Sequence, residues 1–348
     1  MLERGRTEPS LEICWTARNM RVTRPSSSAR LSNAAVSLAS VACLAACRPK
    51  AVTTSELDWA YPRAPEAPLP PAPPGVYQVP GSALRVSAEV LAERTPDWFP
   101  NEHPPAPAIV AEGRKGGSEA CSGCHNYNGA GFLGIPGLAG LTATYIVEQI
   151  HEFRSGRRRS TQPDRPAVEA MTLIAKQVTD QDLSEAAAYY AALERPAWYR
   201  VVETATVPRT IPDHAGWRDL DPEGGVEPIS GRILELPEDA HRMFWMGDHH
   251  LGVVVYAPPG AVASGAAVAH SGGGPGQPCT SCHGADLKGL GEAPALAGRS
   301  AAYLARELWD IKSGARSGPA VALMQAPAKG LSAAQVRDVA AYLSSLDP

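Results

Sequence analysis

Two stretches of the chain carry hydrophobic residues with the period of an amphipathic helix. Apolar positions repeat there at i, i+3, i+4 and i+7, which places them on one helical face. The residues are Leu183, Ala186, Ala187 and Tyr190 in one stretch and Val336, Val339, Ala340 and Leu343 in the other. Thr179 with Asp182, and Ser332 with Gln335, stand in capping-box positions ahead of them. The pattern therefore predicts two helices that begin at these caps.

Other patterns predict a mainly α protein with a small β-containing part. Helices are expected at 142–152 and 300–311, and a third helix of each group near 106–113 and 262–270. Apolar runs bounded by Gly and Pro predict short strands at 232–236 and 251–256. We therefore expect two units of three to four helices each, with long loops, separated by the strands.

The N-terminal region has the pattern of an export signal. Residues 34–46 are uncharged, small and apolar, and Arg21, Arg24 and Arg30 precede them. A run of this length is too short to span a bilayer as a helix, but it suits the hydrophobic part of a signal peptide. Residues 1–19 do not look like a signal, so Met20 is an alternative start.

The end of this run, Leu44-Ala45-Ala46-Cys47, resembles the lipobox of bacterial lipoproteins. That resemblance implies a lipid on Cys47 and anchoring of the protein to a membrane. Arg48 in the next position slightly favours the outer membrane. The alternative is a plain secretory signal with an incidental Cys. Prolines crowd residues 62–74, which favours an extended tether.

Composition and charge narrow the function classes. The chain has 32 Lys and Arg against 36 Asp and Glu, for a formal net charge of −4. This negative net charge argues against a nucleic-acid binder, because recognition of phosphates needs a basic face. The basic cluster 157–159 is short, and we interpret it as a solvated loop. Only 4 Phe are present, so a large buried cofactor would help to fill the cores.

The cysteines carry the most specific signal. Cys14 and Cys43 lie in the expected signal region, and Cys47 is the lipidation candidate. The remaining four fall in two pentapeptides, Cys121-Ser122-Gly123-Cys124-His125 and Cys279-Thr280-Ser281-Cys282-His283. C-x-x-C-H is the attachment signature of c-type haem, in which two thiols bind the porphyrin and the His reaches the iron. The sequence therefore predicts two covalently bound haem c groups.

Two other uses of paired cysteines are less consistent with the sequence. A zinc site can use C-x-x-C pairs, but these pairs are 158 residues apart and each carries an unexplained His. A redox disulfide suits an oxidising compartment, but it does not need a His next in line twice.

An internal repeat suggests the second axial ligands of the iron. With an offset of 158 residues the two haem motifs coincide, and after a gap Met171 meets Met324. A Met in a loop opposite the proximal His can bind iron and raises its reduction potential. Core filling is the alternative for one Met, but not readily for two at equivalent positions.

The other histidines are weaker candidates. His151 is the main rival ligand, but its repeat equivalent is Trp309, so a packing position is the preferred interpretation. The pair His249-His250 could bind an adventitious metal ion, although an exposed loop is the simpler interpretation.

The repeated segments resemble domains of the dihaem cytochrome c4 type. The residues that carry the resemblance are Pro136, Leu138-Ala139-Gly140, Tyr145, Ser155-Gly156 and Met171, and their counterparts Pro294, Leu296-Ala297-Gly298, Tyr303, Ser313-Gly314 and Met324. The family implies class I cytochrome c folds, His/Met ligation and electron transfer between periplasmic redox proteins. It also implies that the carbonyls of Pro136 and Pro294 accept a hydrogen bond from the proximal His.

These inferences divide the chain into five parts. They are a signal peptide (1–46), a lipid-anchored tether and irregular lead-in (47–105), a first cytochrome c domain (106–195), an inserted connector (196–259) and a second cytochrome c domain (260–348). The connector departs from the family, in which the domains are joined directly. It is a structural connector, a hairpin over the domain interface or a docking surface.

The preferred function is an electron carrier of the periplasm rather than an enzyme. Its expected partners are a donor dehydrogenase and a terminal oxidase or reductase. The first alternative is a dihaem enzyme, such as a thiosulfate dehydrogenase or a peroxidase, which would need an open or exchangeable iron. The second alternative is a cytochrome subunit of a dehydrogenase or oxidase complex.

Overall fold

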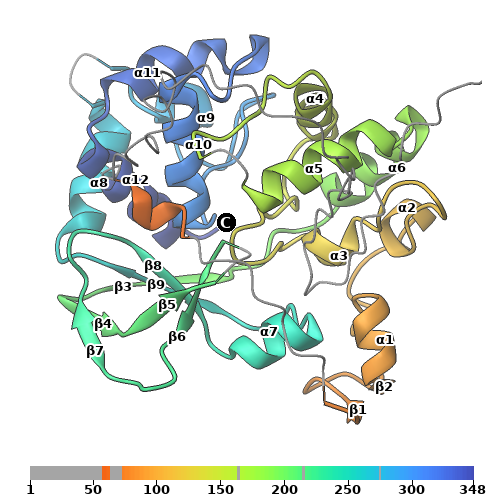
Figure 1. The fold of residues 1–348 in the computed structure, drawn as a ribbon. Coiled ribbons are helices and arrows are strands. Elements are labelled where there is room, and N and C mark those ends of the chain that lie inside the picture. Colours follow the sequence, from red (N-terminus) through yellow and green to blue (C-terminus); the bar gives the residue numbers. More distant parts are fainter. Residues whose placement is uncertain (1–56, 63–72, 163–164, 214–215, 274–275) are drawn as a thin grey trace, which may run out of the picture.

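The computed structural model describes residues 57–62, 73–162, 165–213, 216–273 and 276–348. Two groups of helices lie side by side, and the strands of the middle of the chain lie below them in the view of Figure 1. Within the described residues no helix is both long and apolar enough to cross a membrane. The predicted signal peptide and Cys47 lie outside the described residues.

The first helical unit contains the three predicted helices and two more, at Ser122–His125 and Pro166–Gln177. Its elements are α2 (Ala108–Ala111), α3 (Ser122–His125), α4 (Ala143–Arg154), α5 (Pro166–Gln177) and α6 (Asp180–Ala191). The hydroxyl of Thr179 accepts a hydrogen bond from the Asp182 backbone N–H and so caps α6, as the sequence predicts. Leu183, Ala187 and Tyr190 of α6 are buried in the core of this unit.

The second helical unit repeats this order around a larger core. Its elements are α8 (Ala261–Ser271), α9 (Thr280–His283), α10 (Ala301–Ser313), the 3-10 helix η2 (Pro319–Met324), α11 (Gln325–Gly330) and α12 (Ala333–Ser345). Ser332 and Gln335 form the predicted capping box at the start of α12. α8 crosses α12 at Gly265, where an added Cβ would lie 2.0 Å from the carbonyl oxygen of Asp338.

The insert between the units is a small sheet with extensions. A three-stranded sheet has the order β3 (Tyr199–Glu203), β9 (Val253–Ala257), β8 (Leu234–Pro237). β8 and β9, the two predicted strands, pair antiparallel, whereas β3 runs parallel to β9. The pairs β4 (Thr206–Pro208) with β7 (Val226–Pro228) and β5 (Thr210–Pro212) with β6 (Arg218–Leu220) extend it, and α7 (Ala240–Met246) lies between β8 and β9.

The insert packs against the second helical unit. Val253, Val255 and Ala257 of β9 are buried in the same apolar cluster as Val336 and Val339 of α12. The sheet therefore shares a core with the second unit instead of forming a separate domain.

The lead-in before the first unit also folds onto the rest of the protein. It contains the 3-10 helix η1 (Asp58–Ala60), β1 (Val76–Tyr77), β2 (Val86–Ser87) and α1 (Ala88–Glu93). Trp98 is buried, and its indole N–H donates to the carbonyl oxygen of Met246 at the end of α7 over 2.6 Å. Tyr61 donates to the Asp310 carboxylate of α10 over 2.9 Å. The lead-in therefore contacts both the insert and the second unit.

Candidate cofactor sites

The first C-x-x-C-H motif forms the single-turn helix α3. Cys121 stands at the N-cap of α3, and Cys124 lies one turn later, so both thiols lie on one side of the turn. His125, the last residue of α3, is buried. Its Nδ1 lies 2.9 Å from the carbonyl oxygen of Pro136. With Nδ1–H donating to this carbonyl, Nε2 keeps its lone pair for another partner.

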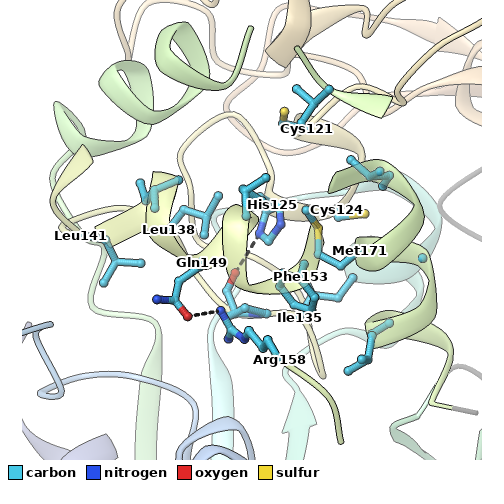
Figure 2. A pocket seen from close by; sticks show the side chains of 18 of the residues that line it. Cys121, Cys124, His125, Ile135, Leu138, Leu141, Gln149, Phe153, Arg158 and Met171 are labelled. Carbon is cyan, nitrogen blue, oxygen red and sulfur yellow. Dashed lines mark hydrogen bonds between the residues drawn. The ribbon is translucent and has the colours of Figure 1, made fainter. Parts of the chain in front are cut away.

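A cavity lies beside α3 and brings the motif together with one distant residue. Cys121, Cys124, His125 and Met171 all line it, and Figure 2 shows these side chains gathered around the pocket. The rest of its wall is mainly apolar; Ile135, Leu138, Leu141, Ile146, Phe153 and Ile174 are examples. The structure therefore brings Met171 beside the first motif, and its binding to iron stays a prediction.

The position of Met171 in the fold differs from the expectation. The sequence predicts a loop at this position, but Met171 lies within helix α5. Pro166 occupies the first turn of α5, where a Pro lacking its N–H is well tolerated, and the following residues are mostly good helix formers. The helix therefore presents Met171 to the cavity.

Burial favours the neutral forms of the motif residues at this site. Burial lowers the pKa of His125 to about 4, against the opposing effect of its hydrogen bond to Pro136. Burial also raises the pKa of Cys121 to about 12. The imidazole is therefore neutral at physiological pH, which is the form that binds a metal.

These residues fit a covalently attached haem. The four cysteines of the two motifs are free thiols rather than disulfides. The pocket combines two such thiols, a neutral imidazole with its Nδ1 occupied, and a thioether, around an apolar wall. Two thiols for the porphyrin edge and nitrogen and sulfur donors for iron are the donor set of a His/Met haem c.

The second motif repeats the geometry in a more open setting. It forms α9, and Nδ1 of His283 lies 2.8 Å from the carbonyl oxygen of Pro294. Burial lowers the pKa of His283 as well. Cys282 is exposed, unlike any cysteine of the first motif. Met324 ends η2 and is partly buried in an apolar cluster that contains Ile311.

Six polar side chains join the two helical units beside the first cavity. They occupy equivalent places in the repeat and are Tyr145, Gln149 and Arg158 with Tyr303, Glu307 and Arg316. We refer to them as the interface network. All six line the cavity of the first motif, so the second unit contributes part of its wall.

The hydrogen bonds of the interface network follow an approximate two-fold pattern. Arg158 donates to Gln149 of its own unit over 2.9 Å and to Tyr303 and Glu307 of the other over 3.3 and 3.1 Å. Arg316 pairs with Glu307 of its own unit and donates to Tyr145 and Gln149 of the other over 3.0 and 2.7 Å.

The interface network corrects one sequence interpretation. Residues 157–159 are not simply a solvated loop, because the side chain of Arg158 is only 10% exposed and pairs with Glu307. Burial alone would raise the pKa of Glu307, but Arg158 and Arg316 outweigh it and hold the pKa at about 2. Arg158 and Arg316 are equivalent in the repeat, but a basic run is usually solvated, so no pattern in the sequence predicts their burial.

Two interpretations of histidines also need correction. His151 lies on α4 but is exposed and does not line the cavity, so it is not packed as expected. His249 is only 2% exposed, whereas the sequence suggested an exposed loop, and burial lowers its pKa to about 3. Its neighbour His250 is exposed, as expected.

Comparison with known proteins identifies similar sequences. The family described as Cytochrome c matches residues 110–194 and 275–347. The cytochrome c-554(548) of Halomonas halodenitrificans is 44% identical over 19% of this chain and 82% of its own length. The cytochrome c4 of Pseudomonas aeruginosa is 25% identical over 65% of this chain and 83% of its own length.

A further relative carries a more specific description. The thiosulfate dehydrogenase electron acceptor of Thiomonas intermedia is 25% identical over 65% of this chain and 78% of its own length. Among solved structures, the thiosulfate dehydrogenase TsdBA of Marichromatium purpuratum is 28% identical with a TM-score of 0.47. The match covers 69% of this chain and 39% of that structure.

Proposed function

The chain belongs to the cytochrome c family and is a dihaem electron-transfer protein of the cytochrome c4 type; from this premise we propose that it is a carrier in the periplasm rather than an enzyme. It has two covalently bound haem c groups, one for each cytochrome c domain. When bound, each haem supplies one-electron iron chemistry.

We assign the attachment and ligation roles by motif and position. The thiols of the two motifs would form the bonds to the porphyrins, and the motif histidines and the two equivalent methionines would bind the irons. The residues are Cys121, Cys124, His125 and Met171 for the first haem and Cys279, Cys282, His283 and Met324 for the second. The carbonyls of Pro136 and Pro294 fix the orientation and tautomer of the two imidazoles.

The observation that carries the carrier proposal is the position of Met171. It lines the same cavity as His125, so its thioether would be available to the iron together with the imidazole. An enzyme that acts at the iron needs an open or readily exchanged position there. A closed iron exchanges electrons and excludes substrates.

We propose a dehydrogenase of sulfur compounds as the electron donor. The support is the printed description of the Thiomonas relative, an electron acceptor of thiosulfate dehydrogenase. A terminal oxidase or reductase would then be the acceptor. Anchoring through a lipid on Cys47 would keep the carrier at a membrane, most simply the outer membrane.

Reduction by thiosulfate tests the donor and the carrier role together. The purified holoprotein should stay oxidised with thiosulfate alone and become reduced when a thiosulfate dehydrogenase is added. The visible haem spectrum reports reduction. Sustained oxidation of thiosulfate, or turnover of peroxide, by the protein alone would overturn the carrier assignment. If the haems stay oxidised with the dehydrogenase present, thiosulfate dehydrogenase is excluded as the electron donor.

A further inference from the structure

Three potential metal ligands meet where the lead-in contacts the insert. Glu102 belongs to the lead-in, and His249 and His250 follow α7 in the insert. One ligand atom of each residue lies within 4.8 Å of the others, and we call this group the Glu102 cluster. The Nε2 of His250 and the Oε2 of Glu102 are only 2.6 Å apart.

His249 provides a second, independent observation that points to a bound ligand. The residue is 2% exposed, and its Nε2 has no hydrogen-bond partner among the described residues. An unpaired polar atom in such a place destabilises the folded protein. Most buried polar atoms of native proteins are paired, so this ring nitrogen is available to a bound ligand.

The turn that carries the two histidines is held in place. The carboxylate of Asp248 accepts a hydrogen bond from the His250 backbone N–H over 3.0 Å and pairs with Arg242 of α7. The ring of His250 stacks on Phe99, with the ring centres 3.7 Å apart. The imidazoles are therefore positioned before any ion binds, which reduces the entropy lost on binding.

We propose that Glu102, His249 and His250 bind one divalent transition-metal ion, with Zn²⁺ as the best fit to the donor set. Two imidazoles and one carboxylate are common zinc ligands, and they leave a fourth position for water. Tetrahedral zinc with bonds of about 2.0–2.1 Å separates its ligand atoms by about 3.3 Å. The close contact of His250 with Glu102 opens slightly to reach this value, and the ring nitrogen of His249 completes the site.

A metal ion here would fasten together two segments outside the cytochrome c domains. Glu102 follows Phe99 and Trp98, which pack against the end of α7. The carbonyl oxygen of His249 accepts a hydrogen bond from Asn128, three residues after His125, over 3.4 Å. The site thus lies at the junction of the lead-in, the insert and the first haem-motif loop.

Zinc binding by the untagged holoprotein tests the proposal. The holoprotein is first treated with a chelator that leaves both haems attached and is then incubated with Zn²⁺. It should retain one equivalent of Zn²⁺ through gel filtration, as measured by elemental analysis. X-ray absorption at the zinc edge should show two imidazoles and further oxygen ligands at about 2.0 Å. Retention of no zinc, or a spectrum without imidazole, would overturn the site.

Variants separate the Glu102 cluster from other surface histidines. Glu102→Gln and His250→Ala change exposed residues and should each abolish retention of the zinc equivalent while the haem and circular dichroism spectra stay unchanged. His249→Ala should also abolish zinc retention. Because it changes a buried residue and can disturb the fold, the variants of the exposed residues Glu102 and His250 decide the test. His241→Ala alters an exposed histidine of α7 outside the cluster and should retain zinc. Unchanged zinc retention by His250→Ala and Glu102→Gln would refute the assignment.

Discussion

Met171 and Met324 occupy equivalent places in the sequence repeat but different local structures. Met171 lies within the helix α5, whereas Met324 is the last residue of the 3-10 helix η2. Pro166 and Pro319 open these two elements, so the repeat is preserved at their start. The sequence could equate the two methionines, but it could not show that one would sit on a regular helix.

Replacing the methionines one at a time tests the proposed ligation. Met171→Ala should remove about half of the far-red Met–iron charge-transfer band and lower the potential of one haem by on the order of 100 mV, since the axial ligand strongly sets the potential. Met324→Ala should affect the other haem, and redox titration measures both. Met243→Leu, a change in the apolar core, is the control. Two normal potentials in Met171→Ala would exclude Met171 as a ligand.

Glu307 is the only acid in the interface network, and two buried arginines depend on it. Glu307→Gln leaves both guanidinium groups without their carboxylate, which should cost about 3 kcal/mol of the free energy of unfolding. Guanidinium denaturation of the holoprotein measures this. Glu223→Gln removes an 86% exposed partner of Arg209 and should cost less than about 1 kcal/mol. Equal losses in the free energy of unfolding would show that Glu307 stabilises the protein no more than an exposed ion pair does.

At the scale of elements, the sequence predicted those parts of the fold that local patterns determine. The caps at Thr179 and Ser332 and the apolar periods behind them were confirmed as α6 and α12. The parallel strand β3 was not predicted, because its partner β9 lies some fifty residues later and no local pattern reports such pairing. Likewise, the cavity around His125 depends on side chains from both units, which only the tertiary structure brings together.

The crossing of α8 and α12 depends on a residue without a side chain. Gly265→Ala would place a Cβ 2.0 Å from the Asp338 carbonyl oxygen, so the helices must separate. We expect a loss of about 2 kcal/mol, because overpacking typically costs about 1–3 kcal/mol and exceeds the gain in helix propensity. Thermal unfolding measures it. Ser264→Ala, an exposed neighbour on α8, should be nearly neutral. A higher thermal stability of Gly265→Ala would show that the contact between α8 and α12 accommodates a methyl group.

At the scale of the whole molecule, the interface network makes domain association sensitive to acid. The pKa of Glu307 falls from an ordinary 4.5 to about 2 in the folded protein. A carboxylate with a depressed pKa contributes stability that is complete above about pH 4.5 and is lost as the pH falls through about 2. Its protonation removes the charge that the two arginines share.

The pH dependence of stability should therefore differ between the wild type and Glu307→Gln. The difference in free energy of unfolding should be constant above about pH 4.5 and shrink toward zero near pH 2. Denaturation curves across this range measure it, and the subtraction cancels the other carboxylates. A difference independent of pH would show that the Glu307 charge is not what stabilises the interface.

The two-fold pattern of the interface network also bears on how such a chain can arise. Each arginine donates to the Tyr and to the 149/307 position of the other copy. A face with such reciprocal contacts is isologous, so two identical one-haem domains can share it as a homodimer. Among the six residues of the interface network, only Gln149 and Glu307 differ in type between the two copies. Fusion of the two copies into one chain allows this difference, because each position then varies alone. The fused protein can give its two irons unequal electrostatic surroundings, which a symmetric dimer cannot do.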